Sequence, residues 1–370
     1  MFGNLSPAQR QVLETVWRRG PIARHEIAGI IGLTGASITR LTRELGEMGL
    51  VVDSVARDGG RGQPARPVSL SSSGAFAVGV NFSHSFLDIG IINLIGETVG
   101  HERVALPQPD PLEIARIARD ALERLRLRAR IPLKRIVGVG FSVPGDFRSD
   151  GRFHAHAYFP QLADKDLRAV FAEAMPIPIV VENDGASAAL GERIHGVGIG
   201  LSTFMLVHIG HGVGGGLILD GALFRGAHDN AGMIGVNFPL TEPRPSGQDL
   251  FQTLAHAGII AKDFDALETI DHAHPAVSGW IARAGAQLAD GLYSAVRLLD
   301  PQAVILGGRL PPRLQTALFE AMPLAERLAR DLAGGTNLPG PRILNSTLGM
   351  HAGVTGAAAT CFFKAFFNHR

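Results

Sequence analysis

Residues 209–216 read IGHGVGGG, with five glycines in seven positions, and they span the junction of two apolar segments, 203–209 and 214–219. Both flanking segments have the length and the apolar character of buried strands. Glycine permits positive φ angles and a close approach of the backbone to an anion, so the stretch is a candidate phosphate-binding loop. Glycine-rich loops also occur in ordinary hairpins, and this stretch alone therefore has low specificity.

A second strand end carries polar side chains that can bind a hydroxyl group. Residues 180–184 read VVEND, so Asn183 and Asp184 leave an apolar strand and begin a helix. A carboxylate there can accept a proton from a hydroxyl, and the neighbouring amide can orient the same ligand. The competing interpretation is that Asp184 is only the N-cap of the helix, and the local sequence favours it. A third strand end, residues 300–308 (DPQAVILGG), finishes in a glycine pair.

Outward from these motifs, apolar strands alternate with helices along most of the chain. The other predicted strands are 75–82, 86–94, 98–106, 136–141, 177–181 and 303–306. The predicted helices are 111–129, one that follows Asp184, 248–260, 278–299 and 314–332. Strands interleaved with helices indicate an α/β body, which we expect to form two lobes with a cleft between them.

The first seventy residues have a different pattern. Ser6 and Pro7 predict the start of one helix, residues 24–31 a second short helix, and Thr34 the cap of a third. A strand then begins near residue 49, and the basic loop 57–67 (RDGGRGQPARP) follows it. This order is that of a winged helix-turn-helix. From Met1 to Val68 there are nine arginines, no lysine and six acidic residues, a local surplus of positive charge.

The outer face of the third helix has short or hydrogen-bonding side chains, as a helix that enters the major groove of DNA requires. We expect Arg40 to read guanine, Thr34 to hold a phosphate at the helix start, and Ser37 to hold a phosphate or to read a base. Arginines separated by glycine and proline suit the narrow minor groove. The predicted DNA-binding residues are Thr34, Ser37, Thr39, Arg40, Arg43, Arg57, Arg61 and Arg66. The competing interpretations are a solvated surface helix for Arg40 and Arg43 and a plain linker for the loop.

Composition excludes several classes of protein. The chain has 370 residues, of which 46% are hydrophobic and 19% charged, so it is not largely disordered. The formal net charge of +1 excludes a nucleic-acid coat over the whole surface but not a local basic patch. A single cysteine, Cys361, excludes disulfides within the chain and a multi-cysteine metal cage. Neither a signal-peptide core nor a run of about 18 apolar residues occurs, so we expect a cytoplasmic protein without a membrane segment.

Together, the order and spacing of the motifs resemble one family. After the winged helix-turn-helix come Pro144-Gly145 at a strand end, END (182–184), the glycine stretch, GALFRGAHDNAG (221–232), LDPQAVILGG (299–308) and AGVTGAA (352–358). The chain resembles the ROK family (repressors, open reading frames and sugar kinases), in its regulator branch, over almost its whole length. The resemblance implies an actin-like, two-lobed sugar-kinase fold behind a DNA-binding head, assembled as a dimer or tetramer. It also implies that a sugar or sugar phosphate in the cleft changes operator affinity.

The resemblance divides the chain into three parts. Residues 1–70 are expected to form the winged helix-turn-helix domain. Residues 75–183 are expected to form the first lobe, to which a C-terminal helix at 351–370 returns. Residues 184–350 are expected to form the second lobe, with the effector cleft and the oligomerisation surface.

The sequence departs from the kinases of this family at the phosphate-binding positions. Residues 81–85 (NFSHS) lack the acidic residue and the glycines of the first phosphate loop, and His211 replaces the threonine of the second. Phosphoryl transfer depends on positioned charge, so these losses predict that the protein is not an enzyme, although Asp184 keeps the position of the catalytic base. Gly210, His211, Gly212 and Gly214 are then a remnant of the phosphate loop. Residues 237–248 (NFPLTEPRPSGQ) replace the zinc-binding cysteines, which predicts no structural zinc and no cofactor.

The sugar-binding positions also differ. By the resemblance, the effector-binding residues are Gly145, Asn183, Asp184, Met233, Val236 and Gln252. Met233 and Val236 stand where the family has glutamate and histidine, and losing two charge-assisted contacts weakens hexose binding by about two to four orders of magnitude. Three alternatives remain: a ligand with an apolar edge, a weakly bound sugar, or an empty cleft controlled by a protein partner. Met233 and Val236 could also be plain core residues.

These observations predict a DNA-binding regulator, most simply a repressor of carbohydrate-related genes. Its expected partners are a double-stranded DNA operator, a sugar or sugar-derived effector, and a second copy of the chain in a homodimer or tetramer, with no membrane. The alternatives are a sugar kinase with an attached DNA-binding head, and a regulator whose vestigial cleft is controlled by a protein partner.

Overall fold

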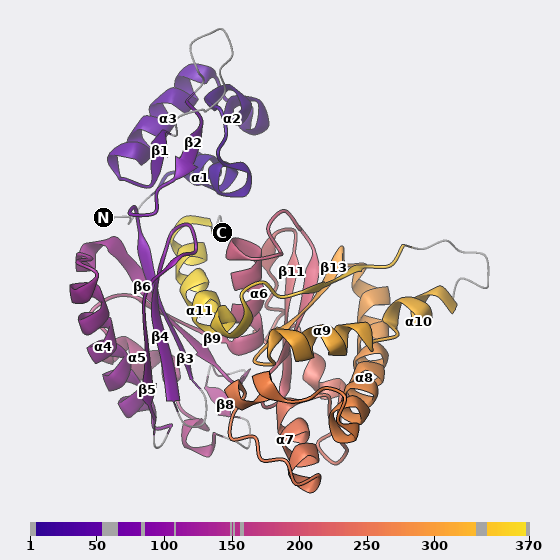
Figure 1. Cartoon of the computed structure of the whole chain (residues 1–370). Coiled ribbons are helices and arrows are strands. Elements are labelled where there is room, and N and C mark those ends of the chain that lie inside the picture. Colours follow the sequence, from indigo (N-terminus) through magenta and orange to yellow (C-terminus); the bar gives the residue numbers. More distant parts are fainter. Residues whose placement is uncertain are drawn as a thin grey trace. The chain divides into compact units, whose positions relative to one another are not determined.

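The computed structural model describes residues 5–53, 66–82, 86–106, 109–148, 150, 152–155, 159–330 and 339–367 (Figure 1). The chain divides into two compact units. The first unit comprises Met1–Val143, Ala155–Glu182 and Ala357–Arg370, and the second comprises Pro144–His154 and Asn183–Gly356. Among the described residues, no helix combines the length and the apolar character that crossing a membrane requires.

Three short helices form the N-terminal part of the first unit: α1 (Pro7–Arg19), α2 (Arg24–Ile31) and α3 (Gly35–Glu47). The expected caps are present. The Ser6 side chain accepts a hydrogen bond from Gln9 N, with Pro7 in the first turn, and Thr34 accepts one from Ser37 N. The inward side chains, which form one small core, are Val12, Leu13, Val16, Ile27, Ile38, Leu41 and Leu45.

A two-stranded antiparallel sheet follows the helices. Its strands are β1 (Val51–Asp53) and β2 (Val68–Leu70), and they pair Val51 with Leu70 and Asp53 with Val68. Helices and sheet together confirm the winged helix-turn-helix. Most of the wing, with Arg57 and Arg61, lies outside the described residues.

The larger part of the first unit is built on a five-stranded sheet of order β5-β4-β3-β6-β9. The strands are β3 (Phe76–Phe82), β4 (Phe86–Asn93), β5 (Thr98–Ala105), β6 (Ile136–Val143) and β9 (Ile179–Asn183). The pairs β3–β4 and β4–β5 are antiparallel, whereas β3–β6 is parallel. Helices α4 (Pro111–Arg128) and α5 (Leu167–Ala174) lie together on one face of this sheet (Figure 1).

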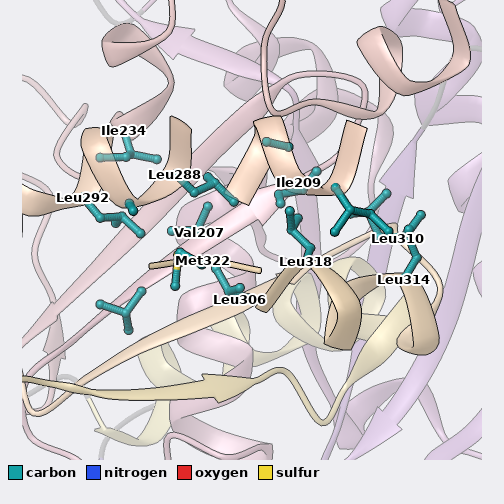
Figure 2. Packing of buried hydrophobic residues seen from close by; sticks show 14 of the residues in the cluster. Val207, Ile209, Ile234, Leu288, Leu292, Leu306, Leu310, Leu314, Leu318 and Met322 are labelled. Carbon is teal, nitrogen blue, oxygen red and sulfur yellow. The ribbon is translucent and has the colours of Figure 1, made fainter. Parts of the chain in front are cut away.

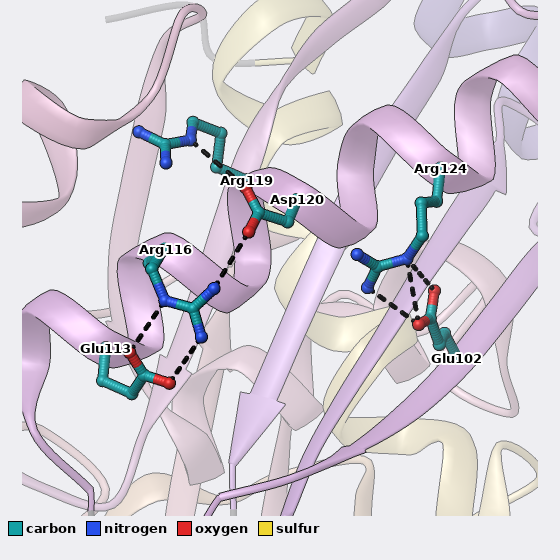
Figure 3. Close-up of polar contacts among 6 residues, drawn as sticks. All are labelled: Glu102, Glu113, Arg116, Arg119, Asp120 and Arg124. Atoms are coloured by element: carbon teal, nitrogen blue, oxygen red, sulfur yellow. Dashed lines mark hydrogen bonds and ion pairs between the residues drawn. The ribbon is translucent and has the colours of Figure 1, made fainter.

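Exposed ion pairs cover the outer side of α4 (Figure 3). Arg116 binds Glu113 and Asp120 on its own helix, at 2.7 and 3.1 Å. Arg124 reaches Glu102 of β5 at 2.8 Å, so this pair joins the helix to the sheet. Because solvent screens such exposed pairs, they contribute little to the stability of the folded protein.

The second unit contains a second five-stranded sheet of order β12-β11-β10-β13-β14. Its strands are β10 (Phe204–Ile209), β11 (Val213–Leu219), β12 (Ala222–Leu223), β13 (Ala303–Gly308) and β14 (Arg342–Asn345). Numbered along the chain within each sheet, both five-stranded sheets have the order 3-2-1-4-5, and both pair the first strand antiparallel with the second and parallel with the fourth. This repeated topology confirms the two-lobed sugar-kinase-like α/β fold.

The core of the second unit lies between its sheet and two helices, α8 (Pro275–Leu299) and α9 (Pro312–Glu320). Val207, Ile209 and Leu306 project from β10 and β13 toward Leu288 and Leu318 (Figure 2). Helix α6 (Asp184–His195) packs on β10 and β11, and α7 (Gly247–His256) packs on α8.

Two predictions about helices are wrong. The single helix expected at 314–332 is two helices, α9 and α10 (Leu324–Arg330), because Pro323 cannot continue α9. Asp184 is not the N-cap of α6. Asn183 is, and it accepts hydrogen bonds from Gly185 N and Ala186 N. The sequence analysis also missed α5, β12, β14 and a small pair formed by β7 (Gly145–Phe147) and β8 (Phe153–Ala155).

The C-terminal helix α11 (Ala352–Phe362) continues into a π-helical turn, η7 (Phe363–Phe367). The second half of α11 packs against β6, where a side chain at Gly140 would overlap the carbonyl oxygen of Ala357. The turn then contacts α1: Arg10 Nη1 donates to Ala365 O at 2.7 Å, and the rings of Trp17 and Phe367 stack with centroids 4.7 Å apart. The N-terminal head is therefore bound to the C-terminal segment of the same unit.

Candidate functional site

Helix α3 presents a polar face that its own head does not cover. Its inner side chains are buried, whereas Thr34, Thr39, Arg40 and Arg43 are exposed and Ser37 is partly exposed. Thr34 Oγ1 lies 2.9 Å from Ser37 Oγ, and Thr39 Oγ1 donates to Gly35 O on its own helix. The sequence-predicted reading face is thus one continuous surface.

The two arginines of this face are already paired within α3. Arg40 Nη1 lies 2.7 Å from Glu44 Oε1, and Arg43 Nε lies 3.7 Å from Glu47 Oε1. Glu44 also accepts a hydrogen bond from Gln9 Nε2 of α1 at 2.9 Å. The Arg40 side chain is 59% exposed, and such pairs on a helix contribute only about 0.3–0.5 kcal/mol. A phosphate or a base edge can therefore replace the carboxylate as the arginine's partner.

Arg24 holds the base of the wing, and the sequence analysis missed this role. Its guanidinium donates to Thr42 Oγ1 at 3.0 Å, to Asp53 Oδ1 at 2.7 Å and to the carbonyl of Arg66 at 3.3 Å. These bonds join α2, α3, β1 and the residue that enters β2. No motif marks Arg24, because its partners are 18 to 42 residues away in sequence. Arg66 itself is exposed.

A second polar cluster forms where β9 ends and α6 begins. Asn183 Nδ2 donates to Gly145 O at 2.7 Å, while its oxygen caps the helix. Asp184 Oδ1 accepts from Gly185 N at 2.8 Å. Gly145 has a φ of 149°, and a Cβ there would lie 2.5 Å from the Phe153 ring, so only glycine fits. The structure thus brings together Gly145, Asn183 and Asp184.

Two titratable side chains that the sequence analysis left out lie beside Asp184. His208 of β10 is buried, and its Nε2 lies 4.0 Å from Asp184 Oδ2. Burial lowers the pKa of His208. The Asp184 carboxylate partly offsets this effect, and the positive charge of Arg309 lowers the pKa further. Burial likewise raises the pKa of Asp146, with a further rise from Asp184 and an opposing effect of His154. Asp184 therefore faces a neutral imidazole, and it can accept a hydrogen bond from a ligand hydroxyl.

The signals for these two residues were weak. His208 lies in a strand buried on both faces, where alternation marks no special position. Asp146 follows the Pro144-Gly145 motif directly, so its position next to this motif was a sequence signal for a site residue.

The remnant of the phosphate loop divides into two parts. Gly214 lies beside Asp184, since a Cβ there would be 3.5 Å from Asp184 Oδ1. Gly210 and His211 instead bind the start of α7: Gly247 N donates to Gly210 O at 2.8 Å, and Gln248 N donates to His211 O at 3.0 Å. The imidazole of His211 meets the edge of Phe264, with ring centroids 5.2 Å apart. Gly210 N donates to Gly212 O, which closes the loop on itself.

Met233, Val236 and Gln252 take no part in the hydrogen bonds that join Gly145, Asn183 and Asp184. Met233 is partly exposed at the start of a short 3-10 helix, η3 (Ile234–Asn237), and Gln252 is exposed on α7. Val236 is 71% exposed, so the interpretation of Val236 as a core residue is wrong. Within the ranges that the structure describes, no three His, Cys, Asp or Glu side chains lie together as metal ligands.

Comparison with known proteins gives relatives along the whole chain. An uncharacterized protein of Sinorhizobium fredii, y4fQ, is 38% identical over 98% of this chain and 92% of its own length. A xylose repressor of Caldicellulosiruptor bescii is 28% identical over 61% of this chain and 58% of its own length.

Two solved structures share the fold. A ROK family transcriptional regulator, a homologue of the E. coli MLC protein, has a TM-score of 0.73 and 20% identity, covering 97% of this chain and 96% of its own. A ROK family glucokinase from Streptomyces griseus, in complex with glucose and AMPPNP, has a TM-score of 0.62 and 22% identity, covering 77% of this chain and 99% of its own. The family comparison matches residues 77–362. With more than half of its length matched, the chain belongs to the ROK family.

Proposed function

We propose that this protein is a DNA-binding transcriptional repressor of sugar-related genes. The observation that carries the proposal is the exposed, arginine-bearing face of α3. This helix is followed by the β1–β2 pair of a wing and lies N-terminal to a ROK domain. The similarity to a xylose repressor and to a ROK transcriptional regulator supports it.

The DNA contacts are assigned by groove. Arg40, Thr39 and Ser37 read base edges in the major groove, and Thr34 and Arg43 hold phosphates. Arg57, Arg61 and Arg66 enter the minor groove or lie beside it. The chain binds a palindromic operator as a homodimer, alone or within a tetramer, in the cytoplasm, with half-sites about one or two helical turns apart.

The effector site is the cluster at the start of α6. Asn183 and Asp184 present an amide and a carboxylate to the hydroxyl groups of a sugar or sugar derivative, and the carbonyl of Gly145 orients Asn183 by accepting a hydrogen bond from its Nδ2. Met233, Val236 and Gln252 border the same ligand. Residues 1–70 bind DNA, and the remainder of the chain forms the two lobes, the second of which also carries the oligomerisation surface.

The protein does not transfer phosphoryl groups. The phosphate-loop remnant is bound to the start of α7 instead, since the amides of Gly247 and Gln248 donate to the carbonyls of Gly210 and His211. His211, which replaces the expected threonine, packs against Phe264. We expect the protein to bind neither a structural zinc nor a nucleotide cofactor.

The test begins with selection of a binding sequence from random duplex DNA by the full-length protein. We expect one palindromic site, which Arg40→Ala weakens and the matched surface variant Arg119→Ala does not. Arg119 is likewise an exposed helical arginine paired with a carboxylate, but it lies on α4. Recovery of no preferred sequence would contradict the proposal.

The effector is identified by thermal-shift screening against sugars, sugar phosphates, deoxy sugars and acidic sugars, because binding to the folded state raises its stability. Asp184→Asn should abolish each shift, and a true effector should also change operator affinity. A coupled assay with ATP and each hit tests the kinase alternative, for which measurable turnover would decide. Operator binding without any sugar hit would favour control by a protein partner.

A further inference from the structure

A cavity of about 610 Å³ lies within the first unit, where α1, β6, β9 and the C-terminal segment meet. It is separate from the Asn183–Asp184 cluster, none of whose residues lines it. Its volume falls in the range of small-molecule sites, about 300–1,000 Å³. The lining residues of the cavity are Arg10, Leu133, Lys134, Ile136, Val137, Gly138, Ile177, Pro178, Ile179, Val180, Cys361, Lys364 and Ala365.

The charge of this lining has one sign. Three cationic side chains contribute, Arg10 from α1, Lys134 from the turn before β6, and Lys364 from η7, and none of the described residues that line the cavity carries a carboxylate. Both lysines are exposed, and among the described residues no carboxylate pairs with either of them. Arg10 donates one hydrogen bond, from Nη1, to the carbonyl of Ala365. The lining thus carries three positive groups from three separate elements.

The remaining walls are apolar. They consist of aliphatic side chains from β6, β9 and the preceding loop, several of them partly exposed. Burial raises the pKa of Cys361 to about 12, so its thiol is neutral and behaves as an apolar surface. The described lining residues include no hydroxyl or amide side chain, so the hydroxyl groups of a sugar would lose their hydrogen bonds to water without replacement by these residues.

We propose that this cavity is a binding site for an amphiphilic organic anion, a carboxylate on a hydrocarbon chain. The carboxylate pairs with Arg10, Lys134 and Lys364, and the chain lies along Ile177, Ile179 and Val180. The ligand would contact α1 and η7 at the place where they bind each other, so it is positioned to change how firmly the head is held. This second site takes a ligand chemistry opposite to that of the Asn183–Asp184 cluster.

The test uses the full chain and decanoate as the probe, followed by titration calorimetry. We expect saturable binding, which the double charge reversal K134E/K364E weakens about tenfold or more. Lys165→Glu is the matched control: Lys165 is an exposed lysine of the same unit that does not line the cavity, and its replacement should leave the affinity unchanged. Both altered lysines are exposed, so the variants should keep the stability of the parent protein.

Two further arms identify the chemistry. Decyltrimethylammonium has the same chain with the opposite charge and should not bind the parent protein, and butyrate, with a short chain, should bind more weakly than decanoate. Val180→Trp, which fills the cavity, should abolish decanoate binding. Absence of saturable decanoate binding, equal effects of K165E and K134E/K364E, or equal binding of the cationic amphiphile would overturn the proposal. Because no DNA is used, these outcomes are independent of the proposed function.

Discussion

At the scale of single residues, Arg40 forms an ion pair with Glu44 that a DNA phosphate or base can replace. Its pair with Glu44 is solvent-exposed, and Glu44 is itself oriented by Gln9. The carboxylate thus orients the guanidinium on the outer face of α3, and breaking this ion pair costs little free energy.

We therefore predict that Arg40→Ala relaxes base preference at one position in each half-site, by about 1–3 kcal/mol of discrimination. The measurement compares the parent and variant proteins on a set of operators with single base-pair changes. Arg119→Ala serves as the control. Unchanged preference at every position would exclude Arg40 from base reading.

His208 gives a pH-dependent prediction. Burial lowers its pKa below the ordinary 6.5, so the folded protein keeps the imidazole neutral while the unfolded chain protonates it. Protons then favour the unfolded state below about pH 6.5, and the contribution of this residue falls by up to about 1.4 kcal/mol for each pH unit. Between pH 7 and pH 5, the parent protein should lose more stability than His208→Gln. Denaturant titrations at both pH values test this, and parallel losses would contradict it.

Residue roles were predicted from sequence only where neighbours in sequence decide them. Thr34 and Ser6 cap the helices that follow them, as expected from their position alone. Asn183 and Asp184 were correctly placed at the start of α6, but the N-cap was assigned to Asp184 instead of Asn183, because both residue types cap helices equally well. The bond from Asn183 to Gly145 spans 38 residues and has no local signal.

At the scale of secondary-structure elements, the contact of α11 with β6 depends on an absent side chain. Gly140 lies directly under the backbone of Ala357, which cannot move aside without moving the helix. Gly279 of α8 is the opposite case, since nothing lies within 4 Å of a Cβ placed there.

We predict that Gly140→Ala destabilises the protein by about 3 kcal/mol or more, through overlap with the α11 backbone. Gly279→Ala should be neutral or should stabilise by up to about 1 kcal/mol, because alanine favours the helix. The midpoints of denaturant unfolding of the two variants provide the comparison. Equal midpoints would show that α11 does not pack on β6 as closely as described.

The wing gives a second prediction at this scale. Arg24→Met removes three hydrogen bonds at the base of the wing but keeps the apolar part of the side chain. Because this guanidinium is only partly buried, we expect a loss of about 1 kcal/mol of head stability. Hydrogen exchange of the β1 and β2 backbone amides should become faster, while exchange in the rest of the described residues stays as in the parent protein. Unchanged exchange in β1 and β2 would mean that Arg24 does not support the wing.

Elements were predictable where composition changed sharply at their ends. The apolar runs that became β3, β4, β10 and β13 were all predicted within two or three residues of their bounds. Short edge strands such as β12 and β14 were missed, because each has few residues and gains its strand form from its neighbour. Pro323 indicates the break between α9 and α10, but the apolar periodicity on either side of it favoured the prediction of a single helix.

At the scale of the whole molecule, charge is concentrated at one end of the sequence. The chain carries a formal net charge of +1, yet residues 1–68 contain nine arginines and six acidic residues. DNA affinity should therefore depend on the head and fall steeply with salt, because binding to phosphates releases counterions.

We predict that Arg61→Ala weakens binding to all DNA sequences alike and lowers the slope of log K against log salt by about one unit, because the variant neutralises one phosphate fewer. Binding isotherms at several salt concentrations, on specific and on random duplexes, provide the slopes. An unchanged slope would show that Arg61 does not bind a phosphate.

The order of motifs was enough to predict the family and the fold, because glycine-bearing strand ends recur at characteristic places in the chain. The contacts that bind the head to η7 were not predictable, since they join residues more than 340 positions apart. Neither Arg10 nor Trp17 belongs to a motif, and the aromatic C-terminus has no pattern that names its partner.

The stacking of Trp17 on Phe367 gives the protein an intrinsic optical reporter. The chain contains two tryptophans, and the other, Trp280, is buried in the second unit with its indole N–H donated to Asp249. Emission from Trp17 will respond to water reaching the ring, and so to release of the head, whereas Trp280 will give a constant background. Trp280→Phe would leave a single emitter, with which ligand- or DNA-induced movement of the head can be followed in real time without any attached dye.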